Sequence, residues 1–151
     1  MAYDAYGFYM SGKIAASGDV TSLINGEGGD VALSEDQFQY LFAGCAALTS
    51  APNLPSTTLA EECYYQMFAD CTSLTSAPEL PATTLKEYCY TDMFYGCTSL
   101  VSAPVLNATT LAQCCYEEMF GDCTSLTSAP NLPATELKNR CYCAMLKGVL
   151  R

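Results

Sequence analysis

The chain has 151 residues, half of them apolar and 15% charged, so it can bury the core of one domain and is too apolar for a disordered tail. Its net charge of −10 argues against nucleic acid as a partner. No run approaches 18 apolar residues, so we expect no transmembrane segment. The first residues show neither the basic nor the apolar region of a signal peptide.

Residues 1–40 are predicted to form an N-terminal cap of short strands and one degenerate coil. The segments 7–10 and 13–16 favour strands, and the glycine-rich stretch 25–30 favours a turn. Residues 34–37 resemble the start of a helix, and the apolar residues around them keep the spacing of the repeat that follows. Such a cap would shield the first repeat from solvent.

Residues 41–151 are predicted to form a solenoid of four full coils and a partial fifth, because the sequence repeats every 26 residues. A lone coil loses roughly 1–2 kcal/mol of backbone entropy per residue, and each large apolar side chain returns only about 1.5–3 kcal/mol, so the coils must stack. The recurring positions are Phe42, Phe68, Phe94 and Phe120; Tyr64, Tyr90, Tyr116 and Tyr142; Met67, Met93, Met119 and Met145; and Leu48, Leu74, Leu100 and Leu126.

Each repeat contains a pattern typical of a helix. Three pairs match the capping box, in which a threonine and the side chain three residues later satisfy free backbone donors: Thr58 with Glu61, Thr84 with Glu87, and Thr110 with Gln113. Behind the first pair, Leu59, Cys63 and Met67 recur at i, i+4 and i+8, which predicts an inward stripe of about three helical turns.

The other half of each repeat is expected to be a short parallel strand that ends at a proline. Pro52, Pro78, Pro104 and Pro130 occupy one column, and each removes the same backbone donor. A helix alternating with a parallel strand every 26 residues predicts an α/β fold, a right-handed leucine-rich-repeat solenoid of strand–helix coils with a small β-containing N-terminal cap.

The stretch Met-Phe-Ala-Asp-Cys-Thr-Ser-Leu-Thr-Ser at 67–76, with its copies from Met93, Met119 and more loosely Leu41, resembles the BspA-like leucine-rich repeats of bacterial surface proteins. The resemblance covers about residues 40–148. It implies an extracellular or cell-surface binding protein, often an adhesin, without catalytic residues.

Eight of the ten cysteines form two columns of the repeat, and two lie outside these columns. Both columns, Cys45, Cys71, Cys97 and Cys123, and Cys63, Cys89, Cys115 and Cys141, fall on inward positions. Buried thiols explain them most simply; disulfides between columns or adjacent coils are a second interpretation, and metal ligation is a third. Cys114 and Cys143 are predicted to face solvent, either by drift or to form intermolecular bridges.

Hydroxyl side chains line the predicted strand face. As a binding array for protein or glycan, the candidates are Thr49, Thr75, Thr127, Ser76, Ser102 and Ser128. The alternative is ordinary strand propensity on a solvated sheet.

Catalysis is not expected, since the chain has no histidine and a cysteine nucleophile would have no evident base. We predict no catalytic residue, metal or cofactor. The favoured function is macromolecular recognition or adhesion at the cell surface or outside the cell. The alternative is a structural subunit that stacks head to tail into a filament. Residues 1–137 hold all 16 carboxylates, whereas Lys138, Arg140, Lys147 and Arg151 give the remaining residues a charge of +4. These four basic residues are the candidates for self-association in such a filament.

Overall fold

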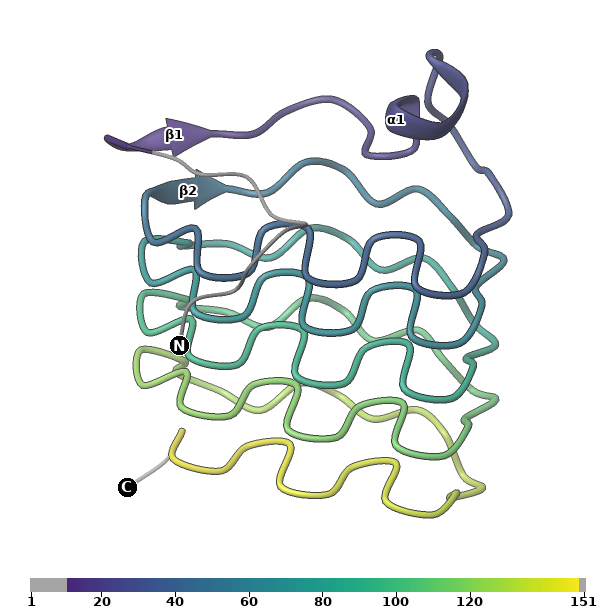
Figure 1. Ribbon diagram of the computed structural model, residues 1–151. Coiled ribbons are helices and arrows are strands. Elements are labelled where there is room, and N and C mark those ends of the chain that lie inside the picture. The colour runs from purple at the N-terminus through teal and green to yellow at the C-terminus, as the bar shows by residue number, and fades with distance from the viewer. Residues whose placement is uncertain (1–10, 150–151) are drawn as a thin grey trace.

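A computed structural model of the chain describes residues 11–149. These residues form a stack of similar coils, each with a zigzag half and an extended half (Figure 1). We call the zigzag segments 34–45, 60–71, 86–97, 112–123 and 138–149 the turn halves, and the segments that connect them the extended halves. The regular elements are strand β1 (Ile14–Ala15), helix α1 (Ser22–Asn25) and strand β2 (Leu48–Ser50).

The predicted strand–helix solenoid is wrong. None of the capping pairs at Thr58, Thr84 and Thr110 begins a helix, and the only helix among the described residues is the four-residue α1. Each turn half is instead a succession of tight turns. Every fourth residue has a positive φ, for example 52° at Glu62, 49° at Gln66 and 58° at Asp70, and an α-helix has no place for such residues.

Backbone hydrogen bonds in the turn halves alternate between two kinds of acceptor. Within one coil, the N–H of Met67 donates to the carbonyl of Tyr64, three residues back, at 3.2 Å. The next N–H, from Phe68, donates to the carbonyl of Met93 in the following coil at 3.0 Å. This alternation repeats along the first four turn halves, and five bonds of the second kind join each pair of consecutive turn halves. We call these inter-coil bonds rungs. They satisfy the backbone groups that a helix would have bonded internally.

The buried positions explain why the segment zigzags. In 63–71 the most deeply buried residues, 0–1% exposed, come as the pairs Cys63 with Tyr64 and Met67 with Phe68, followed by Cys71, while Ala69 is 4% exposed. This pattern has a period of four, whereas four residues of an α-helix overshoot one turn by about 40°. A helix would rotate the later pairs out of the core, while a turn every four residues keeps them all inside. The inward prediction for Leu59, Cys63 and Met67 is therefore confirmed, but without a helix.

The extended halves are joined more sparsely. Strand β2 pairs in parallel with β1, so residues 14–20 lie as a further layer on the extended half 48–53 (Figure 1). Later coils are linked by single bridges, such as Ser76 with Ser102 and Leu80 with Leu106. Of the two strands predicted in the cap, 13–16 contains β1, and 7–10 lies outside the described residues.

The core consists of side chains stacked one coil above another. Phe42, Phe68, Phe94 and Phe120 form one file with ring centroids 5.5–5.7 Å apart and nearly parallel planes. A second file runs from Phe38 through the tyrosine column to Tyr142. Both cysteine columns are buried, and their thiols form no disulfide. The Sγ of Cys71 donates to the carbonyl of Phe42 at 3.1 Å, and Cys97 and Cys123 repeat this bond.

Candidate functional site

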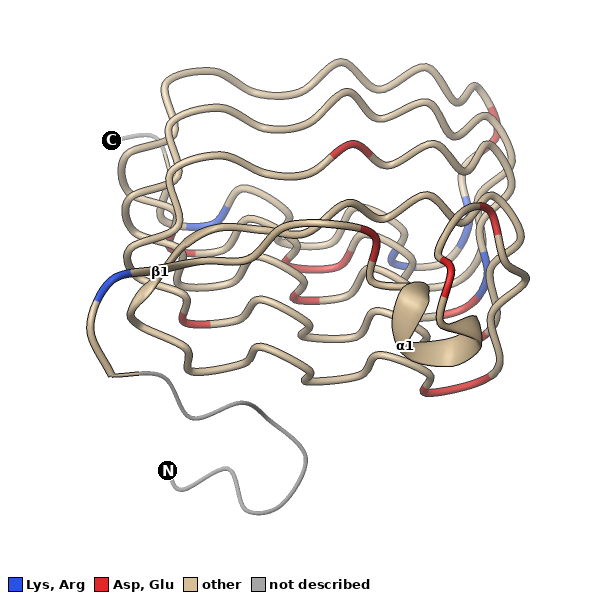
Figure 2. Cartoon of the chain, turned by 90° about the horizontal axis from the view of Figure 1, so that it is seen from above, with Lys and Arg blue, Asp and Glu red and all other residues tan. Residues whose placement is uncertain are grey.

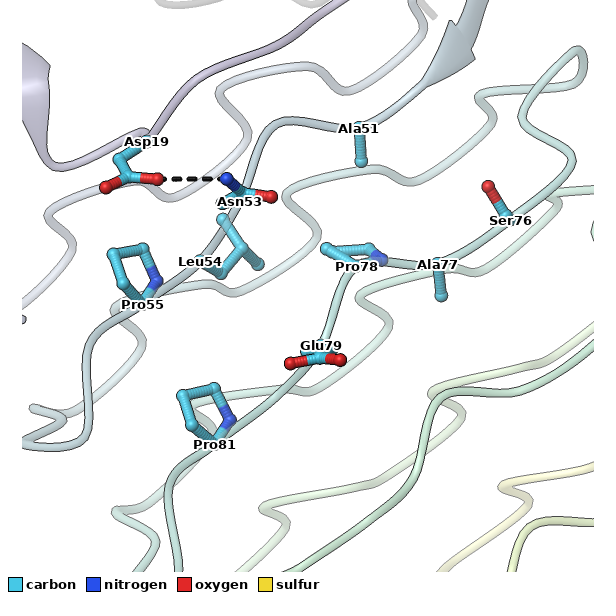
Figure 3. Close-up of a pocket in the computed structure, with 10 residues that line it drawn as sticks. All are labelled: Asp19, Ala51, Asn53, Leu54, Pro55, Ser76, Ala77, Pro78, Glu79 and Pro81. Atoms are coloured by element: carbon cyan, nitrogen blue, oxygen red, sulfur yellow. Dashed lines mark hydrogen bonds between the residues drawn. The ribbon is translucent and has the colours of Figure 1, made fainter. Parts of the chain in front are cut away.

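A hollow lies on the extended halves, between the β1 layer and the next two coils. It has a volume of about 680 Å³ (Figure 3). A second hollow of about 340 Å³ shares Ala77, Pro78, Glu79 and Pro81 with it, so the two form one shallow groove across the coils. The first hollow is lined by Asp19, Ala51, Asn53, Leu54, Pro55, Ser76, Ala77, Pro78, Glu79 and Pro81.

Proline sets the character of the groove. Pro55, Pro78 and Pro81 project from neighbouring segments (Figure 3), and Pro104 and Val105 continue the wall beyond them. Because proline has no N–H, these positions offer apolar surface without backbone donors. Val105 is 73% exposed, a high value for a large apolar side chain. The smaller hollow is therefore mainly apolar, whereas the larger one combines proline surface with the polar side chains of Asp19, Asn53, Ser76 and Glu79.

Glu79 is the one unengaged carboxylate of the groove. Both oxygens of Asp19 already accept hydrogen bonds, from the side-chain amide of Asn53 (Figure 3) and from the backbone N–H of Gly29, each at 3.0 Å. Glu79 is exposed and lies at the junction of the two hollows, with no ion pair to a described residue. It is also the only charged residue in 46–58, 72–84 and 98–110. A cation on a ligand would find no competing lysine or arginine there.

The predicted hydroxyl array is largely engaged in the fold. The threonine hydroxyls donate to backbone carbonyls of the preceding layer: Thr49 to Ile14 at 3.0 Å, Thr75 to Thr49 at 3.4 Å, and Thr127 to Val101 at 3.2 Å. Ser76 lines the groove, and its backbone pairs with that of Ser102. Ser102 and Ser128 are exposed and line neither hollow.

The basic residues predicted for self-association lie on the last turn half. The guanidinium of Arg140 pairs with Glu117, and the ammonium of Lys147 lies 3.9 Å from Glu118. Lys138 is exposed and has no ion pair with a described residue, and Arg151 lies outside the described residues. Viewed along the stack, basic residues are few and acidic ones are spread over several coils (Figure 2).

The solvent-facing prediction for Cys114 is wrong, while Cys143 is exposed. Cys114 is only 2% exposed, because it lies among the longer side chains of Tyr88, Glu117 and Arg140. Its column holds such long side chains in other coils, and they suggested an outward position. The short thiol is covered by its neighbours instead.

The groove is a feature that sequence reasoning missed. The proline column predicts strand ends, whereas two of its members, Pro78 and Pro104, line the groove. In residues 11–149, no three histidine, cysteine, aspartate or glutamate side chains are grouped to hold a metal ion. No helix of the described part of the chain is long and apolar enough to cross a membrane.

Comparison with known proteins gave no match: no family model, no curated protein and no solved structure is similar to this chain. The resemblance to BspA-like repeats therefore stays an untested prediction, and its strand–helix coil is not what the structure has.

Proposed function

We propose that this protein is a non-catalytic recognition module whose extended halves bind an extended polypeptide. The observation that carries the proposal is the groove across the coils, in which proline side chains lie beside the unengaged carboxylate of Glu79. A shallow, elongated groove suits an extended chain better than a compact small molecule. An extracellular or cell-surface location remains part of the proposal, resting on the resemblance alone.

The chemistry of the groove specifies the ligand. Segments 46–58, 72–84 and 98–110 carry no aromatic residue and no cation, so neither a stacked sugar ring nor an acidic ligand has an obvious partner there. Apolar side chains would contact the proline walls, and a lysine or arginine of the ligand would pair with Glu79. The proposed ligand is therefore a polypeptide with a basic residue flanked by apolar ones.

The experiment selects heptapeptides from a random displayed library on the immobilised protein. We expect the selected peptides to be enriched in lysine or arginine between apolar residues. The variant Glu79→Gln should bind these peptides about five- to tenfold more weakly, because it loses a charge-assisted contact. Glu136→Gln is the matched control, because it removes the same charge from an exposed residue outside the groove. Selection of no peptide, equal binding by both variants, or binding only on a parallel glycan array would contradict the proposal.

A further inference from the structure

The last described turn half, residues 138–149, has an edge of backbone N–H groups that pair with no described residue. In every preceding turn half, alternate N–H groups donate to the next coil, as when Tyr116 donates to Cys141 at 3.0 Å. In the last one, the equivalent N–H groups have no acceptor among the described residues. These five donors belong to Arg140, Tyr142, Ala144, Leu146 and Gly148. Because unpaired backbone donors are a template for another chain, this edge is suited to extension.

Leucines beside this edge are exposed as well. Leu132 is 43% exposed, whereas Leu54, Leu80 and Leu106 of the same column are 2–3% exposed. Leu137 is 67% exposed, whereas Leu59, Leu85 and Leu111 of its column are 3–4% exposed. The interior leucines are buried because the next coil covers them. A further coil at this end would therefore remove apolar surface as well as pair five donors.

We propose that a second copy of this chain stacks on the last turn half with its first turn half, residues 34–45. A rung joins each donor to the residue 25 positions later in a 26-residue repeat. If the same spacing continues from one copy into the next, the five donors lie opposite five backbone carbonyls in the first turn half of the second copy. These belong to Glu35, Gln37, Gln39, Leu41 and Ala43, and none of them accepts a bond from a described residue.

Charge matches the two surfaces. Lys138, Arg140 and Lys147 lie on the last turn half, and the exposed carboxylates of Glu35 and Asp36 lie on the first. Asp36 and Arg140 occupy the same position of the repeat, with φ of 55° and 54°. In the stacked arrangement they become neighbours one coil apart, so opposite charges meet at the junction.

The extended halves fit the same arrangement. Residues 14–20 already lie on the extended half 48–53 of their own chain, and would follow the extended half 124–137 of the other copy. Helix α1 carries Leu23, 61% exposed, and Ile24, 41% exposed, which the contact would bring toward Leu132 and Leu137. Phe38 and Phe42 are already buried, so the first turn half offers carbonyls and carboxylates rather than apolar side chains.

The test exchanges the charges at Asp36 and Arg140, and sedimentation velocity of the full chain at low salt measures its assembly. We expect concentration-dependent assembly that weakens as salt rises. Arg140→Asp should weaken it at least tenfold, and Asp36→Arg added to Arg140→Asp should restore it. The column tolerates both residue types at this backbone conformation, as Asp36 and Arg140 show.

Lys86→Asp serves as the control, since Lys86 holds the position of Lys138 in an interior coil and should not affect assembly. A monomer at every concentration and salt, unaltered assembly of Arg140→Asp, or a double variant no better than the single would overturn the proposal. The readout is independent of peptide binding, so either proposal can fail alone.

Discussion

The carboxylate of Asp70 fills the space that a side chain at Gly96 would need. Two coils further along, Asp122 does the same at Gly148. Aspartate and glycine alternate in this column, through Gly44, Asp70, Gly96, Asp122 and Gly148. All five residues have positive φ, which glycine adopts freely and aspartate tolerates better than most residues. The alternation therefore spaces the bulky members of the column two coils apart.

Gly96→Ala is expected to destabilise the fold by about 2–4 kcal/mol, because it adds both a contact with Asp70 and strain at a φ of 70°. Adding Asp70→Gly should recover all but roughly 1 kcal/mol of this loss, since only the strain remains. Urea unfolding of the two variants measures both values. A double variant no more stable than Gly96→Ala would show that the contact is unimportant.

Tyr90→Phe is expected to leave stability unchanged or to raise it by about 1 kcal/mol. The hydroxyl of Tyr90 is buried without a hydrogen-bond partner among the described residues, so its removal relieves a desolvation cost. Phe38 already occupies this column and stacks on Tyr64 with ring centroids 5.9 Å apart. Tyr90→Ala should lower the free energy of unfolding by about 3–5 kcal/mol, because it leaves a cavity in the stack of aromatic rings. Comparable losses in both variants would mean that the hydroxyl makes an essential bond.

Alkaline pH should unfold the protein through its buried thiols. Burial raises the pKa of Cys63 and of Cys123 to about 12, and that of Cys115 to about 11, all from an ordinary value of 9.0. Above pH 9 the unfolded chain loses these protons while the folded chain keeps them, so stability holds below pH 9 and falls between pH 9 and 12. Each thiol contributes at most about 1.4 kcal/mol per pH unit.

Guanidinium unfolding across this pH range measures the decline. Cys123→Ala should make it shallower, whereas Cys143→Ala should not, because Cys143 is exposed. An equally steep decline in Cys123→Ala would rule out its thiol as a contributor.

Thiol labelling under native conditions should modify Cys143 rapidly and the nine buried cysteines slowly. Denaturation should expose all ten. A single accessible thiol can link two copies but cannot build a longer chain, so oxidation should yield a dimer that Cys143→Ser abolishes. Rapid native labelling of Cys114 would contradict its burial among Tyr88, Glu117 and Arg140.

Periodicity predicted the stacking columns, and burial of single side chains needed the coordinates. The 26-residue repeat was sufficient to place Phe68 and Phe94 face to face, because neighbouring coils share one conformation. It did not distinguish a helix from successive turns, since Leu59, Cys63 and Met67 fit both. The decisive feature was the pairing of buried neighbours, such as Cys63 with Tyr64, which repeats every four residues.

The sites were less accessible to sequence reasoning than the repeat. The exposure of Cys114 depends on how long the neighbouring side chains are, including those of other coils. The residues in the repeat column of Cys114 do not by themselves show which side chains will cover it. The sequence does not predict Glu79 as a binding residue, because one carboxylate among prolines matches no binding motif. Its isolation is evident only once the extended halves lie side by side.

Amide hydrogen exchange at Tyr116 and Tyr142, measured by NMR on dilute protein in high salt, tests most directly whether rungs and not helices hold the coils. The two tyrosines share one column, but within residues 11–149 only the N–H of Tyr116 has an acceptor, the carbonyl of Cys141. We predict that Tyr116 exchanges at least 100-fold more slowly than Tyr142. In a helical coil each N–H would bond within its own turn, so equal protection of both tyrosines would contradict the structure.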